Sequence, residues 1–199
     1  MSREYSAGLV SQPFWFVESK KMINLINDGK TDEEIKQLCL DENIFGAAKE
    51  RRAKDIYNGV KGRVKQLDDK LIGLFCTSDV QTQKLIILIS ILKKDKLFFE
   101  FLFEVYREKV ILGEEVMDKP DVNVFFKNKE IQSEEIEQWK DVTKRRLGSA
   151  YINYMVDANL LTIIDKEKRI TPPIMDVALE RYLEATGNTA MIKAITGVR

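Results

Sequence analysis

The sequence predicts a mainly α-helical fold, a helical bundle with two helix-turn-helix elements, the C-terminal one winged by a short β-hairpin. Its 199 residues include only ten glycines and four prolines, and 32% of them are charged, which favours helices over a turn-rich β fold. Apolar residues recur at helical spacing along most of the chain. A hydrophobic content of 44% is sufficient for a packed core.

Two helical domains are expected, packed together as one compact unit. Residues 1–113 form the first, with a helix-turn-helix over residues 31–67, and residues 114–199 form the second, with the winged helix-turn-helix. The stretch from Glu114 to Pro120 holds three acids and one proline in seven residues. This composition marks it as the expected linker.

The first elements are identified by their end signals. Residues 1–12 are expected to form an extended arm, followed by a helix that Pro13 enters and that Gly29 ends. Thr31 then begins a short helix with a capping box, because Glu34 stands three residues further on and can reach back to the Thr31 N–H. The helix is expected to break over Asp41–Gly46, where Asn43 and Gly46 can take turn conformations, and the most basic segment of the chain follows.

The segment from Ile44 to Leu67 is predicted to be one long helix with an apolar stripe and basic flanks. It carries seven basic and two acidic residues in a chain whose net charge is zero. Such segregation favours contacts with nucleic-acid phosphates, although a solvated helix side is the simpler alternative. The candidate contacts are Lys49, Arg51, Arg52, Lys54, Asn58, Lys61, Arg63 and Lys65.

Two apolar segments, Leu85–Leu92 and Leu97–Tyr106, are expected in the core. The first is far shorter than the roughly 20 apolar residues of a membrane span, so no membrane partner is expected. Cys39 and Cys76 lie in apolar surroundings without a CxxC spacing, and no secretory signal precedes them. They therefore indicate reduced thiols in a cytoplasmic protein.

The second half repeats the pattern of the first. Helices are expected to begin at Asp121 and Ser133, and a third helix runs from Asp141 to Ala158 with one apolar stripe. Cations crowd the N-terminal end of this third helix, where they oppose the helix dipole and therefore do not serve helix stability. The N-terminal turn of a recognition helix enters the DNA groove, so the candidate contacts here are Lys140, Lys144, Arg145, Arg146 and Ser149.

Two short β-prone runs follow this helix, around the charged turn Asp165–Arg169. A hairpin directly after a basic helix is typical of the wing of a winged helix-turn-helix. Lys166, Lys168 and Arg169 are then candidates for contacts with the DNA backbone, and an ordinary exposed hairpin tip is the alternative. Two short helices, around Leu179 and over Thr189–Ile195, are expected to close the chain.

Catalysis is not expected. The chain has no histidine, which removes the catalytic triads that depend on imidazole and most zinc sites. The acidic pairs Asp68-Asp69 and Glu114-Glu115 point about 100° apart on a helix and are poor metal ligands. We therefore expect no enzyme activity, no cofactor, no metal and no small-molecule substrate.

A separate acidic region raises a second function. Between Asp95 and Glu137 there are twelve acidic and six basic residues. This surface could dock other proteins, and the chain would then be an assembly subunit that does not bind DNA.

The chain resembles the BrxA family, the small helical component of bacteriophage exclusion (BREX) defence systems. The resemblance covers nearly the whole chain and rests on the order and spacing of several short segments. These are Tyr5–Gly8, Pro13–Phe16, Asn43–Gly46 leading to Arg52–Lys54, Phe98–Phe101, Phe125-Phe126, and Leu160-Leu161 running into Ile170–Pro173. It implies a non-enzymatic defence subunit that binds double-stranded DNA, with other BREX proteins as further partners. An older comparison of the family with NusB-like RNA-binding factors implies RNA as the alternative ligand.

Overall fold

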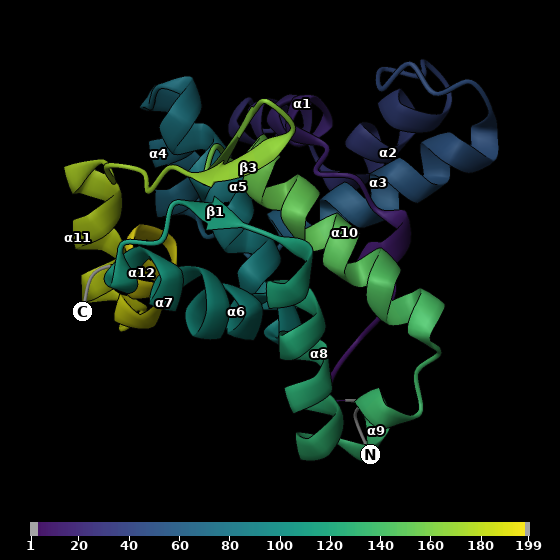
Figure 1. Ribbon diagram of the computed structural model, residues 1–199. Helices are drawn as coiled ribbons and strands as arrows, with labels where there is room; N and C mark the ends of the chain where they lie inside the picture. Colours follow the sequence, from purple (N-terminus) through teal and green to yellow (C-terminus); the bar gives the residue numbers. More distant parts are fainter. Residues whose placement is uncertain (1–3, 198–199) are drawn as a thin grey trace. The chain divides into compact units, whose positions relative to one another are not determined.

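A computed structural model describes residues 4–197 and confirms a mainly helical fold (Figure 1). The chain divides into two compact units. The α1–α5 unit comprises residues 14–94, and the α6–α12 unit comprises residues 95–197 together with residues 4–13 of the arm. Residues 95–113, which were expected in the N-terminal domain, thus group with the C-terminal part. Residues 1–3 of the expected arm lie outside the described part.

The α1–α5 unit is entirely helical across its described residues. Its core includes α5, in which every residue from Leu85 to Leu92 is buried, as the apolar run predicted. Its elements are α1 (Phe16–Asn27), α2 (Asp32–Leu40), α3 (Glu50–Val64), α4 (Asp69–Thr77) and α5 (Val80–Lys94).

The capping box at the start of α2 is confirmed. The Thr31 hydroxyl accepts a hydrogen bond from the Glu34 N–H, and the Glu34 carboxylate accepts one from the Thr31 N–H at 2.8 Å. The start of α1, in contrast, differs from the prediction. The predicted helix started at Pro13, whereas α1 begins at Phe16. Trp15 has a left-handed backbone (φ 54°), which a right-handed helix running from Pro13 could not include.

Helix α3 is shorter than the predicted helix from Ile44 to Leu67. Asn43 and Gly46 both have positive φ, at 49° and 64°, which confirms the predicted turn and interrupts a right-handed helix. The Asn43 side chain also accepts a hydrogen bond from the Ala47 N–H at 2.8 Å and donates one to the Ala47 carbonyl at 2.9 Å. These local bonds hold residues 43–47 as a loop, and α3 starts only at Glu50.

The α6–α12 unit combines helices with a small antiparallel sheet. A single helical rod is formed by α6 (Lys96–Phe101), the π-helical turn η2 (Leu102–Tyr106) and α7 (Arg107–Leu112), between the Asp95 cap and Gly113. The other elements are η1 (Gly8–Ser11), β1 (Val116–Met117), α8 (Lys119–Gln132), α9 (Glu134–Glu137), α10 (Asp141–Asp157), β2 (Leu161–Ile164), β3 (Glu167–Ile170), α11 (Val177–Ala185) and α12 (Thr189–Thr196).

The β-hairpin is confirmed and belongs to a sheet of order β1-β3-β2. Asp165 and Lys166 both have positive φ, 50° and 70°, as a two-residue type I′ hairpin turn requires. The expected linker Glu114–Pro120 is not a free connection, since β1 pairs with β3 through Met117 opposite Lys168. A strand of two residues is too short to leave a periodic signal in the sequence.

Helix α10 is fixed at the centre of this unit by aromatic packing. Tyr151 stacks on Phe98 with 4.7 Å between ring centroids, and Phe101 and Phe126 contact the same tyrosine ring. Where α8 crosses α10, Gly148 leaves no room for a side chain: a Cβ would lie 2.2 Å from Val122 Cγ1. The Val122 side chain of α8 therefore packs directly against the backbone of α10 at Gly148, and side chains of both helices line one hollow.

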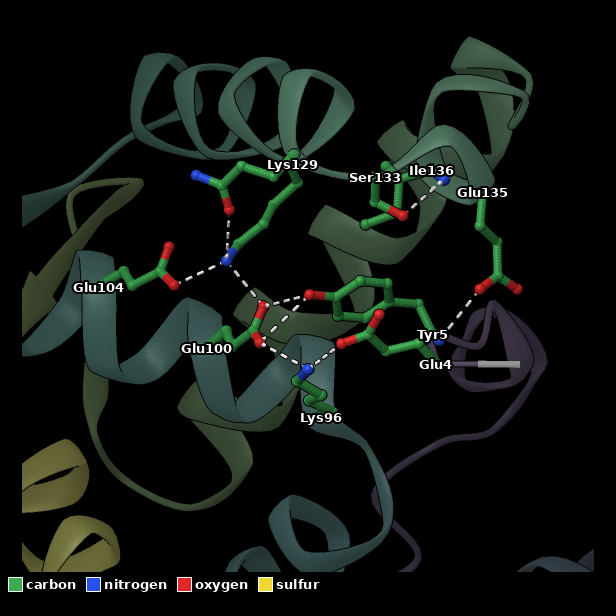
Figure 2. Close-up of polar contacts among 10 residues, drawn as sticks. Glu4, Tyr5, Lys96, Glu100, Glu104, Lys129, Ser133, Glu135 and Ile136 are labelled. Atoms are coloured by element: carbon green, nitrogen blue, oxygen red, sulfur yellow. Dashed lines mark hydrogen bonds and ion pairs between the residues drawn. The ribbon is translucent and has the colours of Figure 1, made fainter. Parts of the chain in front are cut away.

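The arm is anchored to the same unit by polar contacts (Figure 2). The buried Tyr5 donates its hydroxyl hydrogen to the Glu100 carboxylate, and its N–H donates to Glu135 at 3.2 Å. Glu100 also receives the buried ammonium of Lys129 at 2.7 Å. Lys129 belongs to α8, so this network joins the arm, α6 and α8.

Candidate nucleic-acid interface

Each unit carries one of the two predicted basic surfaces. The α3 surface consists of exposed side chains at the start and along one side of α3. Lys54 is partly neutralised by Glu50 at 2.6 Å, and Lys61 forms an ion pair with Asp32 and lies over the Tyr57 ring. The other exposed candidates on this surface are Lys49, Arg51, Arg52, Asn58 and Lys65.

Arg63 does not belong to the α3 surface, although it was predicted there. It is only 1% exposed, its Nη1 donates to the Phe14 carbonyl at 2.6 Å, and its guanidinium lies 5.1 Å from the Trp15 ring centroid. The helical position places Arg63 on the flank that faces Trp15. Charge alone could not distinguish that flank from a solvated one, so the sequence-based prediction is corrected.

The α10 surface has a similar correction. Lys144 is buried and forms ion pairs with Glu130 at 2.5 Å and Asp141 at 3.3 Å. The hydrogen bond to Glu130 is the main reason why the pKa of Lys144 is raised. Its charge is thus used to join α8 to α10, while the neighbouring Arg145 and Arg146 point to solvent.

The three cations of the hairpin differ in exposure and in ion pairing. Lys166 is exposed at the turn and Lys168 is half-buried, whereas Arg169 forms ion pairs with Glu115 at 3.3 Å and Glu167 at 3.2 Å. Arg169 therefore stabilises the sheet and the segment before β1. It has less positive charge to offer a ligand than the other two.

A hollow of about 280 Å³ lies between α8, α10 and the hairpin. It brings together the N-terminal end of α8, the outer side of α10 and Lys168 of β3. A second hollow continues along the same two helices toward Asp141. Polar side chains that line the first hollow are Asp118, Lys119, Asn123, Arg145, Ser149, Asn153 and Lys168.

Four basic or amide residues in these two hollows were missed by sequence reasoning. Asn153 could have been found, because it stands four residues after Ser149 and eight after Arg145, on the same helix side. Lys119, Asn123 and Lys127 carry no such signal, since only the crossing of α8 over α10 brings them to the same surface.

Other kinds of site find little support in the described residues. Nowhere between residues 4 and 197 do three or more His, Cys, Asp or Glu side chains gather as metal ligands. Within the same residues no helix has the length and apolar character to cross a membrane.

The comparison with known proteins decides the family. The model of the BrxA family matches residues 3–187. The chain belongs to the BrxA family. It is 36% identical to the "BREX protein BrxA" of Bacillus cereus (strain H3081.97), an alignment that spans 97% of this chain and 96% of the relative.

A solved structure shares the BrxA-family fold of this chain. It is the crystal structure of an uncharacterized protein from Magnetospirillum magneticum, with a TM-score of 0.82 over 98% of this chain and all of the other. The two sequences are only 16% identical, so the likeness concerns the fold alone. The site residues of the α3 and α10 surfaces must be judged on their own geometry.

Proposed function

We propose that this BrxA-family chain is a non-enzymatic subunit of a BREX anti-phage defence system that binds double-stranded DNA. The assignment to a BREX system follows from its family and from the name of its Bacillus cereus relative. Other BREX proteins are then its partners. DNA binding is supported by the charge and the arrangement of the α10 surface.

The observation that carries the proposal is a group of cations without ion-pair partners in the described part of the chain. Buried or structural cations such as Lys129, Lys144 and Arg169 all have carboxylates within 3.3 Å. The exposed cations around α10 have none, so their charge is available to phosphates. They are Lys119, Lys127, Lys140, Arg145, Arg146 and Lys166, and the half-buried Lys168 also lacks an ion-pair partner among the described residues.

The order of elements around this group supports the same function. A helix, β1, α8, α10 and the β2–β3 hairpin follow one another, and β1 pairs with β3. This is the sequence of elements in a winged helix-turn-helix, with α10 in the place of the recognition helix and the hairpin as the wing. Residues 133–140, which include α9, replace the usual short turn between α8 and α10.

The α3 surface provides a second candidate contact. Its preceding helix α2 and its basic side agree with a helix-turn-helix, but residues 41–49 make the connection longer than the usual turn of about three or four residues. We therefore assign the principal contact to the α10 surface. The α3 surface is a second, separate candidate for phosphate contacts.

The test is the salt dependence of binding to duplex DNA. Each phosphate contact adds about 0.9 to the slope of log K against log salt concentration. R145A/R146A should weaken binding and flatten the slope by about 0.9 for each phosphate contact that is lost, whereas R181A, which removes an exposed arginine from α11, should leave the slope unchanged. R51A/K65A tests the α3 surface in the same way.

Several outcomes would contradict the proposal. An R145A/R146A variant with an unchanged slope would exclude the α10 surface. A preference for RNA in the same titration would favour the RNA-binding alternative. If the wild-type chain binds no nucleic acid but co-purifies with another BREX protein after nuclease treatment, the assembly function replaces DNA binding.

A further inference from the structure

We propose that the hollow between α8, α10 and the hairpin reads base edges, so that this chain recognises duplex DNA in a sequence-selective way. The inference rests on the proposed DNA binding and makes it more specific. Long cations by themselves indicate contacts with phosphates and little selectivity. The structure adds amide and hydroxyl groups at the place where a DNA groove would lie.

The first observation is one polar stripe along α10. Arg145, Ser149 and Asn153 follow one another at intervals of four residues, and all three are exposed. Intervals of four residues keep side chains on one side of a helix, so the three groups point the same way. The opposite side of α10 holds the buried Leu147, Tyr151 and Tyr154, which fixes the orientation of the stripe.

The second observation is that the side-chain amides of Asn123 and Asn153, beside the hollow, do not bond other groups in the described part of the chain. Asn43 and Asn188 use their side-chain amides to bond backbone groups of their own loops. The amides of Asn123 and Asn153 make no hydrogen bond to the described part of the chain. Their donors and acceptors remain available to a ligand, and they converge on one hollow from two helices.

The chemistry of these groups matches base edges in the major groove. An asparagine amide can bond the N6 and N7 atoms of adenine together, and an arginine can bond the O6 and N7 atoms of guanine. Lys119 and Lys168 line the same hollow and suit the phosphates of the backbone. Lys119 and Lys168 thus position the stripe on the backbone, and Arg145 and the amide groups discriminate between bases.

The helix geometry gives the spacing of the recognised bases. Asn153 follows Arg145 by eight residues, which corresponds to about 12 Å along a helix at about 1.5 Å per residue. Base pairs are stacked at about 3.4 Å. The preferred site should therefore contain a guanine and an adenine roughly three or four base pairs apart, on the same strand or on opposite strands.

The experiment is a selection of bound duplexes from a library with a randomised central segment, followed by sequencing. The wild-type chain should enrich a motif with the guanine and adenine at this spacing. N153A should lose the preference at the adenine, by about five- to a hundredfold, with little change in salt slope because asparagine is uncharged. N128A is the matched control, since Asn128 is exposed on the side of α8 that faces away from this hollow, in a separate groove beside α7.

A change of specificity provides the stricter test. N153D keeps the shape of the side chain but leaves only acceptors, so its preferred base should change from adenine to cytosine, whose N4 is a donor. A side chain with a purely structural role would not produce this exchange. If N153D and N153A keep the wild-type motif, or if N128A alters it as much as they do, the inference is overturned.

The selection also separates this inference from the proposed function. Salt-dependent binding without any enriched motif would overturn base reading and leave DNA binding intact. No binding of any duplex would overturn the proposed function itself. An enriched motif that disappears in R51A/K65A but not in N153A would assign selectivity to the α3 surface and contradict the inference.

Discussion

Replacing Lys129 by Met is expected to destabilise the α6–α12 unit strongly. The Lys129 side chain is only 3% exposed, and its ammonium lies 2.7 Å from Glu100 and 2.6 Å from Glu104 (Figure 2). Removing one partner of a buried ion pair costs about 3–5 kcal/mol because the other charge stays buried. Glu104 is 43% exposed and can be hydrated, so we expect K129M to lower the free energy of unfolding by about 2–4 kcal/mol.

Urea unfolding followed by circular dichroism measures this loss, and a triple variant separates charge from packing. K129M/E100Q/E104Q removes the stranded carboxylates and should recover most of the lost stability, because an ion pair replaced as a whole costs little. A loss below about 0.5 kcal/mol in K129M, or a triple variant no more stable than K129M, would refute the reasoning.

The same network predicts a dependence on pH. Burial by itself would lower the pKa of Lys129, but the hydrogen bonds to Glu100 and Glu104 outweigh burial and raise the pKa above 10.5. A raised folded-state pKa contributes stability that is fully present below pH 10.5 and is lost as the pH rises through the raised value. The wild-type chain should therefore lose stability in this alkaline range, and K129M should lose less.

The remaining predictions concern the helix crossing, the buried arginine and the capping box. G148A should cost about 1–3 kcal/mol, since its Cβ would collide with Val122 Cγ1, and G148A/V122A should recover part of this loss in thermal unfolding. R63M should reduce stability in urea by more than about 1 kcal/mol yet leave the salt slope of DNA binding unchanged, because Arg63 is buried. The pKa of Glu34 is lowered to about 2, first by the hydrogen bond from the Thr31 N–H. Wild-type stability from this group is therefore present above the ordinary value of 4.5 and lost as the pH falls toward 2, and E34Q should remove that part of the acid dependence.

The two sides of α8 line two different hollows. The side toward α10 carries the hollow with Asn123, and the side toward α7 carries a separate groove with Val124 and Asn128. Lys129 fastens α8 to the rod of α6 and η2. Helix α8 is thus joined by ion pairs to α6 and η2 through Lys129 and to α10 through Glu130 and Lys144.

Much of the secondary structure could be predicted from the sequence because its signals are local. The Thr31 box, the Asp95 and Ser133 caps, the left-handed Gly113 and Asn159, and the hairpin turn all depend on residues within one or two turns of the chain. The start of α3 was predicted too early, at Ile44. There the Asn43 side chain forms hydrogen bonds with the Ala47 backbone that favour a loop over a helix. The spacing of apolar residues gives no information about such bonds.

The sequence by itself determined that the chain is mainly helical, that it carries two basic helices and that a hairpin follows the second. Only the tertiary structure decided which of the cations are available. Arg63 and Lys144 have the same charge as their exposed neighbours, but one packs on Trp15 and the other bonds Glu130. Burial depends on which side of a helix meets another element, so it is set by contacts between distant residues. For the same reason the hollow that joins Asn123 to Asn153 appears only when α8 crosses α10.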